Sequence, residues 1–521
     1  MNNNYEEHCD ENKNLLSYNL SNDLLDELQK SDYMYNQDKS FFMNLFGNNA
    51  QSIKKNQDNS FYYNLYEYYY RGGFLNIIFS KILEIISLVF GVFFMCFIFI
   101  LLDWNKILKC GKENDIQDCG EIFIYINPQF PNFFCILFLL FSTIFTIYRI
   151  FLFFSNYKSI LEIYEFYNNK LNISADELHT MKWCNVIKRI SDYSELSIYD
   201  ITYIILKQEN YLTALVNENI INISPNLYTK QLELNIKYIF LNNIENLNDN
   251  ENINSKFILF GILNLIFSVF IFIYLILYFF ISNVDEFVSN KYTLGTRTYT
   301  VYAKRKFRNY NEYKHYFKKR INKSLYYSNQ YIKQFPSPIL EMLGKFIGFI
   351  TGTFIGLFLI FSILDESILL YVRLFDRSLI FYTGIFGAIS AASRSLINDP
   401  EDSIYNPEDI MKKIYKYTYY LPYEWDGKCN TYYVRNEFLK MFKYKIFLFL
   451  NDLISVVTTP IILLFVLPKQ RVKMINFLLN NTKYIKNVGN ICTFSEFNKS
   501  SNNKKMELSI SMFQDNNSNM Y

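Results

Sequence analysis

Four long apolar runs constrain this chain more than any other feature of its sequence. They extend over 75–102, 133–154, 340–364 and 374–394, and each reaches the roughly 20 residues that an α-helix needs to cross a bilayer. Composition agrees, because 50% of the 521 residues are hydrophobic and only 19% are charged, below the roughly 25% typical of soluble proteins. The sequence therefore predicts an all-α integral membrane protein with four transmembrane helices.

A fifth apolar run, 256–282, is predicted to enter the membrane and return on the same side. The segment after it, 283–338, carries twelve lysines and arginines, whereas the short loop after the first run has three lysines balanced by acids. The positive-inside rule places such a basic segment in the cytosol, on the same side as 155–255. Gly261, Asn264 and Ser268 offer positions where the helix could break.

A sixth run, 451–468, is predicted to be a second re-entrant hairpin, because its apolar part is only fifteen residues long and Pro460 lies in its middle. The predicted order is a disordered polar tail (1–60), two transmembrane helices with a short lumenal loop (61–154), a cytosolic helical segment (155–255), the first re-entrant element (256–282), a basic amphipathic cytosolic segment (283–338), two further transmembrane helices (339–394), a cytosolic connection (395–450), the second re-entrant element (451–468) and a cytosolic C-terminal segment (469–521).

The stretch 303–356 joins a basic half to an apolar half. In the first half Phe307, Tyr310, Phe317 and Ile321 recur at helical spacing, and lysines and arginines occupy the remaining faces. Two interpretations stay open: a basic amphipathic helix on the membrane surface followed by an ordinary span, or a pair of helices that gates a lipid path. The second half repeats glycine every fourth residue, a spacing that lets another helix approach closely, at Gly344, Gly348, Gly352 and Gly356.

The sequence offers little material for covalent chemistry. Its three histidines are far apart, no CxxC pair occurs among its eight cysteines, and no nucleotide-binding or nucleophile motif is present. We expect no metal, no cofactor and no enzyme activity, and the net charge of +3 is too small to indicate nucleic acid. Cys110 and Cys119 flank a short loop and could form a disulfide if that loop is lumenal.

Polar side chains within the apolar runs are the candidates for a function in the membrane. A lipid headgroup loses hydration in hydrocarbon, so a protein that lets lipids flip needs a polar, water-filled track that is open sideways to the tails. Each candidate also has a structural alternative, a helix–helix hydrogen bond or a side chain that reaches the interface. The candidates are Lys345, Thr351, Arg377, Tyr382, Thr383, Ser390, Arg394, Asn451, Asp452, Ser455, Thr458 and Thr459.

Several segments resemble the autophagy-related protein 9 family. FRNYNEYKHYFKKR followed by QFPSPILEMLGKFIGFITGTF resembles the family's core signature, and further similarity runs from Tyr63 to Phe513. NDLISVVTTPIILLFVLP resembles the family's acidic-pair-then-TP segment. Here the chain departs from the pattern, because Asn451 and Asp452 stand where two acidic residues would be expected, which puts any role that needs two carboxylates in doubt.

The resemblance implies an interlocked homotrimer with four crossings and two membrane-dipping elements per subunit, which scrambles phospholipids between leaflets without ATP. It also implies that the protein is located on Golgi- or endosome-derived vesicles and at the preautophagosomal membrane, with both termini cytosolic. The implied partners are a bridge-like lipid-transfer protein and other autophagy proteins. Two alternatives remain open: an ion channel or leak pathway along the same polar residues, and a non-catalytic scaffold that recruits partners.

Overall fold

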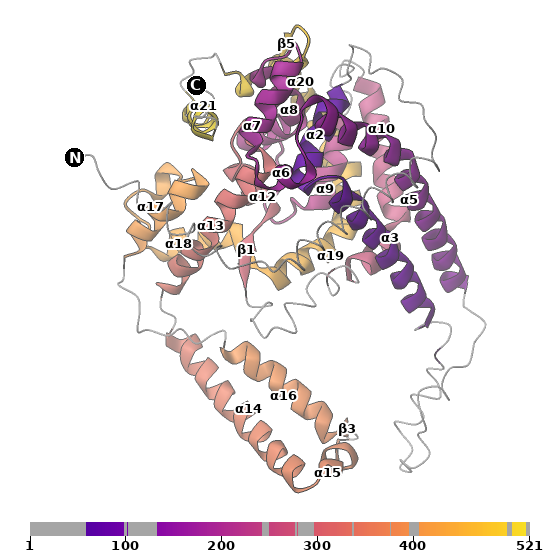
Figure 1. The fold of residues 1–521 in the computed structure, drawn as a ribbon. Helices are drawn as coiled ribbons and strands as arrows, with labels where there is room; N and C mark the ends of the chain where they lie inside the picture. The colour runs from indigo at the N-terminus through magenta and orange to yellow at the C-terminus, as the bar shows by residue number, and fades with distance from the viewer. Residues whose placement is uncertain are drawn as a thin grey trace, which may run out of the picture. The chain divides into compact units, whose positions relative to one another are not determined.

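The computed structural model describes residues 59–97, 102, 133–241, 250–276, 279, 296–335, 338–375, 377–394, 406–497 and 503–516 (Figure 1). The polar tail before residue 59 and the loop with Cys110 and Cys119 lie outside these residues. The tail and the disulfide therefore stay predictions.

The described chain is mostly helical, as the sequence predicts. In chain order the helices are α2 (Asn59–Arg71), α3 (Phe74–Cys96), α5 (Phe133–Glu165), η4 (Phe166–Lys170), α6 (Ala175–Thr180), α7 (Trp183–Tyr193), α8 (Ile198–Asn217), α9 (Lys230–Ile236), η5 (Lys237–Leu241), α10 (Asn250–Ile266), α12 (Val301–Phe307), α13 (Lys314–Lys333), α14 (Pro338–Leu364), α15 (Glu366–Tyr371), α16 (Leu379–Arg394), α17 (Pro407–Thr418), η7 (Tyr423–Trp425), α18 (Tyr432–Met441), α19 (Lys445–Ile461), η8 (Ile462–Val466), α20 (Leu467–Asn480), η9 (Thr493–Ser495) and α21 (Lys504–Asn516).

Among the residues that the structure describes, six short strands form three antiparallel pairs. They are β1 (Arg297–Tyr299) with β4 (Phe442–Tyr444), β2 (Arg373–Leu374) with β3 (Arg377–Ser378), and β5 (Thr482–Ile485) with β6 (Gly489–Cys492). In the first pair Arg297 lies opposite Tyr444, and this pairing fixes the entry to α12 beside the start of α19. The two segments are more than 140 residues apart, so only tertiary structure brings them together.

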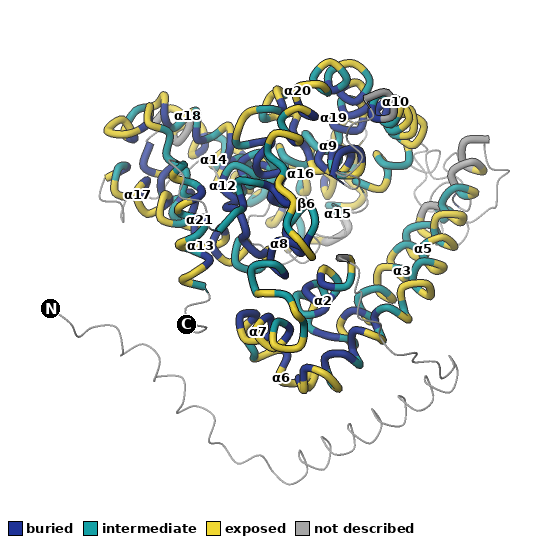
Figure 2. Tube along the Cα trace, turned by 90° about the horizontal axis from the view of Figure 1, so that it is seen from above, coloured by how far each residue is buried: buried dark blue, intermediate teal, exposed yellow. Residues whose placement is uncertain are grey.

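In the described part of the chain, four helical runs are long and apolar enough to cross a membrane: Phe74–Phe94, Leu139–Lys170, Met342–Leu364 and Lys445–Asn480. Large apolar side chains remain exposed along them; Phe79 of α3 is 64% exposed and Ile147 of α5 is 66% exposed. Figure 2 shows exposed residues along both α3 and α5, which pack side by side (Figures 1 and 2). Exposed apolar faces of this length are expected where lipid tails replace water.

The fourth predicted crossing, 374–394, is not among these four runs, because its helix begins later than the sequence suggests and is only 16 residues long. Its helix, α16, starts at Leu379 rather than near residue 374, because the preceding residues form the β2–β3 hairpin and Phe375 adopts a positive φ of 46°. Arg377 therefore lies in a strand, outside the helix that the sequence predicts over 374–394.

The prediction of a break at Pro460 is also wrong. Residues Lys445–Asn480 form one helical run of 36 residues, in which the π-helical segment η8 follows the proline. A proline in a helix interior removes one backbone hydrogen bond and often kinks the helix, but here the helical run continues past it. The hairpin turn expected within 451–468 is thus absent from the described structure.

The run 256–282 contains the expected break. Its helical pieces, Ile253–Ile266 and Ser268–Ile276, meet at an angle of 59°. The bend lies beside Ser268, one of the three positions that the sequence singles out. A bend of this kind occurs both in broken spans and in re-entrant loops, so the predicted side of return stays a prediction.

An ion pair joins the first two membrane helices. Arg149 of α5 donates from Nη2 to Glu84 Oε2 of α3 over 2.8 Å. Lys81 lies three residues before Glu84 in the sequence, yet the acid takes its partner from the neighbouring helix. Pairing of opposite charges lowers the cost of placing both among apolar helices.

The basic stretch 303–335 is not one amphipathic helix. α12 ends at Phe307 and α13 begins at Lys314, and between them Asn311 adopts a positive φ of 54°. The carboxylate of Glu312 accepts a hydrogen bond from the Asn309 N–H, which stabilises this turn. Asparagine and glutamate side chains thus satisfy backbone groups that a continuous helix would pair internally.

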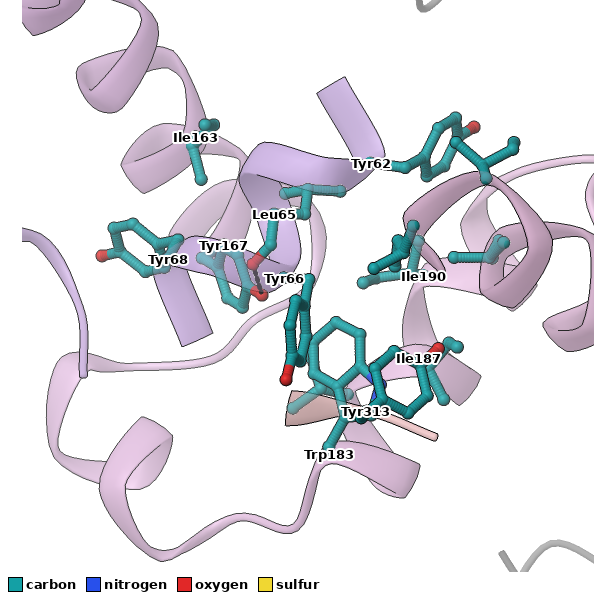
Figure 3. Packing of buried hydrophobic residues seen from close by; sticks show 14 of the residues in the cluster. Tyr62, Leu65, Tyr66, Tyr68, Ile163, Tyr167, Trp183, Ile187, Ile190 and Tyr313 are labelled. Carbon is teal, nitrogen blue, oxygen red and sulfur yellow. Dashed lines mark hydrogen bonds between the residues drawn. The ribbon is translucent and has the colours of Figure 1, made fainter. Parts of the chain in front are cut away.

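Aromatic residues from distant segments form one of the buried clusters (Figure 3). Tyr66 of α2 contacts Trp183 of α7 with ring centroids 5.0 Å apart, and it contacts Tyr313 at the same centroid distance. The Tyr167 hydroxyl donates to the Leu65 carbonyl over 2.9 Å, so a polar tip in this cluster has a partner. The cluster ties α2, which leads into the first membrane helix, to α7 and α13.

Candidate functional site: a polar seam beside α19

Polar side chains from three helices meet beside α19, and we refer to Gln231, Asn235, Asn264 and Ser455 together as the polar seam. Gln231 and Asn235 are one turn apart on α9, Asn264 lies on α10, and Ser455 lies on α19. α9 and α10 both pack against α19, which places the polar side chains at the contact between these elements.

Hydrogen bonds join the members of the seam in sequence. The amide of Gln231 donates to Asn264 Oδ1 over 2.8 Å, and the amide of Asn264 donates to Asn235 Oδ1 over 2.9 Å. The hydroxyl of Ser455 donates to the Asp452 carbonyl of its own helix over 2.6 Å and lies 3.2 Å from Gln231 Oε1, its contact with the rest of the seam. Because Asn264 and Ser455 sit in apolar runs, these bonds keep polar groups together at a depth where lone polar groups would be costly.

Charged groups extend the seam. Lys304 of α12 interacts electrostatically with Asp452 of α19 and with Lys230. Burial lowers the pKa of Lys304, the charge of Lys230 lowers it further, and the Asp452 carboxylate opposes that shift. Two cations beside one carboxylate, one turn from Ser455, make this end of the seam suited to a phosphate group.

One hydroxyl near the seam has no protein partner. Thr459 follows Ser455 by one turn on α19, its side chain is 1% exposed, and its Oγ1 makes no hydrogen bond with the described residues. Leaving a buried hydroxyl unpaired costs about 1–3 kcal/mol. Water or a polar ligand group in the seam would satisfy it.

A buried ionic network holds α9 against α8 and α12. Arg305 of α12 donates from Nε to Glu233 Oε2 over 2.9 Å, and Arg308 lies 2.7 Å from Glu209 Oε2 of α8. Lys237 also pairs with Glu209. Burial alone would raise the pKa of Glu209, but Arg308, Arg305 and Lys237 outweigh it and hold that pKa well below its usual range.

A second buried pair fixes the start of α13. Arg320 donates from Nε to Glu312 Oε1 over 2.8 Å and from Nη2 to Glu312 Oε2 over 2.7 Å, a bidentate arrangement. Its Nη2 also donates to the Phe307 carbonyl over 2.9 Å. The basic stretch thus uses Arg305, Arg308 and Arg320 inside the protein, and the prediction that Arg305 and Arg308 occupy a free polar face is wrong.

The sequence-predicted residues divide into two groups. On α19, Asp452 and Ser455 belong to the seam region, Thr459 lies one turn away, and Asn451 and Thr458 are partly exposed beside them. The remaining candidates lie on the α14–α16 hairpin, away from these hydrogen bonds: Lys345, Thr351, Arg377, Tyr382, Thr383, Ser390 and Arg394.

Polar groups of the hairpin bond mostly within their own element. The hydroxyl of Thr351 donates to the Ile347 carbonyl over 2.8 Å, and that of Thr383 donates to the Leu379 carbonyl over 3.0 Å. The Tyr382 hydroxyl donates to the Leu374 carbonyl over 2.8 Å, and Arg377 lies over the Phe381 ring at 5.6 Å. Ser390 contributes its carbonyl, which accepts from Ser393 over 2.8 Å.

The remaining hairpin candidates are more exposed. Lys345, in the second turn of α14, and Arg394, the last residue of α16, are both exposed. Among the glycines, Gly344 is buried, and a Cβ on Gly348 would lie 3.2 Å from Ser393 Oγ. Positions 352 and 356 are open within this chain. Their role in close helix packing stays a prediction.

Sequence reasoning missed Gln231 and Asn235. Their spacing of four residues puts them on one face of a helix, a signal that the sequence does contain, but α9 lies in a polar segment where such a face is ordinary. In the described residues, no group of three or more His, Cys, Asp or Glu side chains could hold a metal ion.

Comparison with known proteins agrees with the arrangement of apolar helices. The family model for autophagy protein ATG9 matches residues 53–498. Autophagy-related protein 9 of Dictyostelium discoideum is 33% identical over 463 residues, which cover 83% of this chain and 66% of that protein. The Saccharomyces cerevisiae protein of the same name is 32% identical over 473 residues, covering 83% of this chain and 47% of the yeast protein.

A solved structure has the same fold. The cryo-EM structure of Schizosaccharomyces pombe Atg9 aligns with a TM-score of 0.62 at 27% identity, covering 84% of this chain and 98% of that one. The chain spans about half the length of the yeast relative and two thirds of the Dictyostelium one. By the extent of the family match and the identity to these relatives, this membrane protein belongs to the autophagy protein ATG9 family.

Proposed function

We propose that the chain lets phospholipids move between bilayer leaflets without ATP, in the growth of autophagosome-type membranes. The observation that carries this proposal is the polar seam, in which Asn264 and Ser455 of two apolar runs share a hydrogen-bonded line with Gln231 and Asn235. A headgroup that follows such a line exchanges its water for amide and hydroxyl partners, while its tails stay in lipid.

The charges at one end of the seam support the same proposal. Lys304 and Lys230 attract a phosphate, and the Asp452 carboxylate keeps the pair from binding it permanently. The unpartnered hydroxyl of Thr459 adds a further site for water or a headgroup oxygen. Downhill movement along such groups needs no covalent step and no nucleotide.

The assembly and location belong to the same proposal. Resemblance to the family supports an interlocked homotrimer with four crossings per subunit, both termini cytosolic, on cytoplasmic vesicles and the preautophagosomal membrane. It also supports work beside a bridge-like lipid-transfer protein. The twelve basic residues of 283–338 support a cytosolic position for that segment. Protease cleavage of it in sealed vesicles tests this; protection from the outside, in vesicles whose cytosolic face is outward, would overturn the topology.

The test of function is lipid flipping in liposomes that contain the purified chain. Dithionite bleaches labelled lipid in the outer leaflet, so complete bleaching without ATP indicates scrambling, and bleaching that stops at the outer-leaflet fraction contradicts it. Asn264→Leu, which keeps the branching and number of side-chain heavy atoms but is apolar, interrupts the seam, and we expect it to slow flipping about tenfold or more, as the loss of a buried polar partner implies.

Thr143→Val is the matched control. It removes one hydroxyl from a membrane helix, α5, where that hydroxyl donates only to carbonyls of its own helix, Leu139 and Leu140, both over 2.9 Å. Equal slowing by both variants would show that the seam is not the path. Release of a trapped ion without lipid flipping would favour a leak pathway, and neither movement together with failed membrane delivery would favour a scaffold.

A further inference from the structure

A basic cavity lies where α2 turns into the first membrane helix, and it is separate from the polar seam. Its volume is about 500 Å³, and its walls include Arg71 from the end of α2, Asn76 and Ser80 from α3, and His315, Lys318 and Lys319 from α13. Small-molecule sites typically enclose roughly 300–1,000 Å³, so the space admits a sugar-phosphate as well as a lone phosphate.

The cavity adjoins the first turns of the first membrane helix. α3 begins at Phe74, and the apolar run that it opens continues in the sequence to residue 102. About 20 residues suffice for the hydrocarbon core, so the first two turns, with Asn76 and Ser80, remain for the headgroup layer. Two glycines set this position: Gly72 and Gly73 have φ of 78° and 91°, which an L side chain rarely adopts.

The charges of the cavity are poorly balanced by the protein. Arg71 lies 3.6 Å from Glu67, whereas Lys318 and Lys319 make no ion pair with any residue that the structure describes. Three cations against one carboxylate leave a formal charge of +2 beside the membrane surface. A phosphomonoester, with a charge of roughly −1.5 to −2 at pH 7, matches this excess better than a phosphodiester does.

His315 adds a ring nitrogen without a partner among the described residues. Its backbone N–H donates to the Tyr66 hydroxyl over 3.4 Å, so the hydroxyl hydrogen is directed to His315 Nδ1, 3.0 Å away. His315 Nε2 is buried and has no hydrogen-bond partner among the described residues. Burial raises the pKa of Tyr66, which keeps this hydroxyl protonated as a donor.

The same environment keeps the imidazole neutral. Burial, with the nearby charge of Lys319, lowers the pKa of His315 to about 4. A neutral ring adds no charge, so the cations of the cavity alone set its charge. These uncompensated cations are what an anionic ligand would complete.

We propose that this cavity binds the phosphomonoester headgroup of an anionic phospholipid, with Lys318, Lys319 and Arg71 on the phosphate and the neutral His315 ring in the wall. The ligand enters from the leaflet on the side of α13, and its acyl chains lie along the exposed apolar face of α3. The proposal does not depend on scrambling, because it concerns binding at a separate place.

The experiment titrates the full chain in neutral detergent with short-chain phosphatidic acid, phosphatidylserine, inositol monophosphate and inorganic phosphate. We expect phosphatidic acid to bind more tightly than phosphatidylserine, and both soluble phosphates to bind at least about tenfold more weakly, since they lack chains that pack on α3. If inositol monophosphate bound as tightly as phosphatidic acid, the ligand would not need to be a lipid, and that part of the proposal would be wrong. If phosphatidylserine bound as tightly as phosphatidic acid, the preference for a phosphomonoester headgroup would be wrong.

Two pairs of substitutions distinguish binding in the cavity from general attraction to the positive charges of the protein surface. Lys318→Gln with Lys319→Gln should weaken phosphatidic acid binding by about tenfold or more, as the loss of two charge-assisted contacts implies. Lys323→Gln with Lys333→Gln removes two exposed charges from the same helix outside the cavity, and we expect less than about a twofold effect from it. Equal effects of the two pairs would overturn the proposal.

A further variant covers the case in which the double substitution impairs folding. Lys318→Arg with Lys319→Arg keeps both charges and should retain binding, and Arg71→Gln should weaken it. Lipid binding is measured in detergent, without any flipping assay. A failure of the binding proposal can therefore be told apart from a failure of the scrambling proposal.

Discussion

Two regions of this chain handle polar side chains in opposite ways. Around α12 and α13, charged and amide groups bond across long sequence separations: Arg305 reaches Glu233, Arg308 reaches Glu209, and Asn210 donates to Asn311 Oδ1 over 2.8 Å. In the α14–α16 hairpin, the hydroxyls of Thr351 and Thr383 return to carbonyls of their own helix.

The difference follows from the surroundings. The first region excludes water, so each charge must be compensated by a partner from another element, and each partner thereby fixes the arrangement of helices. The hairpin leaves large apolar side chains exposed, such as Phe349 at 70%, and a hydroxyl there needs no more than its own backbone. The polar seam beside α19 combines the two, because its groups lie in apolar runs yet bond between helices.

The largest effect that would test this comparison is expected from Arg320→Ala. Glu312 would keep its buried charge without its bidentate partner, a loss that typically costs about 3–5 kcal/mol. We expect a large fall in thermal unfolding temperature and in the yield of monodisperse protein in detergent. Thr351→Val in the hairpin serves as the control and should change stability by less than about 0.5 kcal/mol. Similar losses in both would show that the two regions do not differ.

Glu209→Gln should have a smaller effect, about 2–3 kcal/mol at neutral pH, because the amide keeps part of the hydrogen bonding. It should also change the pH dependence. The folded pKa of Glu209 lies below its unfolded value, so the carboxylate contributes stability above the unfolded pKa, about 4.3, and loses it as the pH falls through the folded one. Unfolding measured from pH 7 downward should be less acid-sensitive in the variant than in the original chain. An unchanged slope would mean that the network does not stabilise the fold through this group.

The third and smallest expected effect is the difference in stability between Gly348→Leu and Gly352→Leu, two substitutions within α14 of the hairpin. At 348 a Cβ would already lie 3.2 Å from Ser393 Oγ of α16, so overpacking should cost about 1–3 kcal/mol. At 352 nothing lies within 4 Å, so the monomer should be unaffected. Loss of assembly on sizing with Gly352→Leu alone would place the glycine face against another copy of the chain. Equal destabilisation of the single chain by both variants would contradict the open position of Gly352.

Part of the candidate site was accessible from sequence. Asp452, Ser455 and Thr459 stand out because they are polar residues in an apolar run, and Asn264 stands out as a break in another. Their partners Gln231 and Asn235 do not, since polar residues in a polar segment carry no signal of burial. The membership of the seam depends on which helices pack on α19, and this depends on contacts more than 200 residues apart, such as Ser455 with Gln231.

The sequence alone determined that this is a helical membrane protein, because runs of 20 or more apolar residues have few alternatives to crossing a bilayer. It also determined the family, through motifs that extend over most of the chain. Tertiary structure decided where the charges go: Arg305, Arg308 and Arg320 look like a solvated face in sequence, yet each finds an acid on another element or beyond a turn. It also decided that the helix continues through Pro460, because the packing of α19, η8 and α20 against α10 offsets the one backbone hydrogen bond that a proline removes.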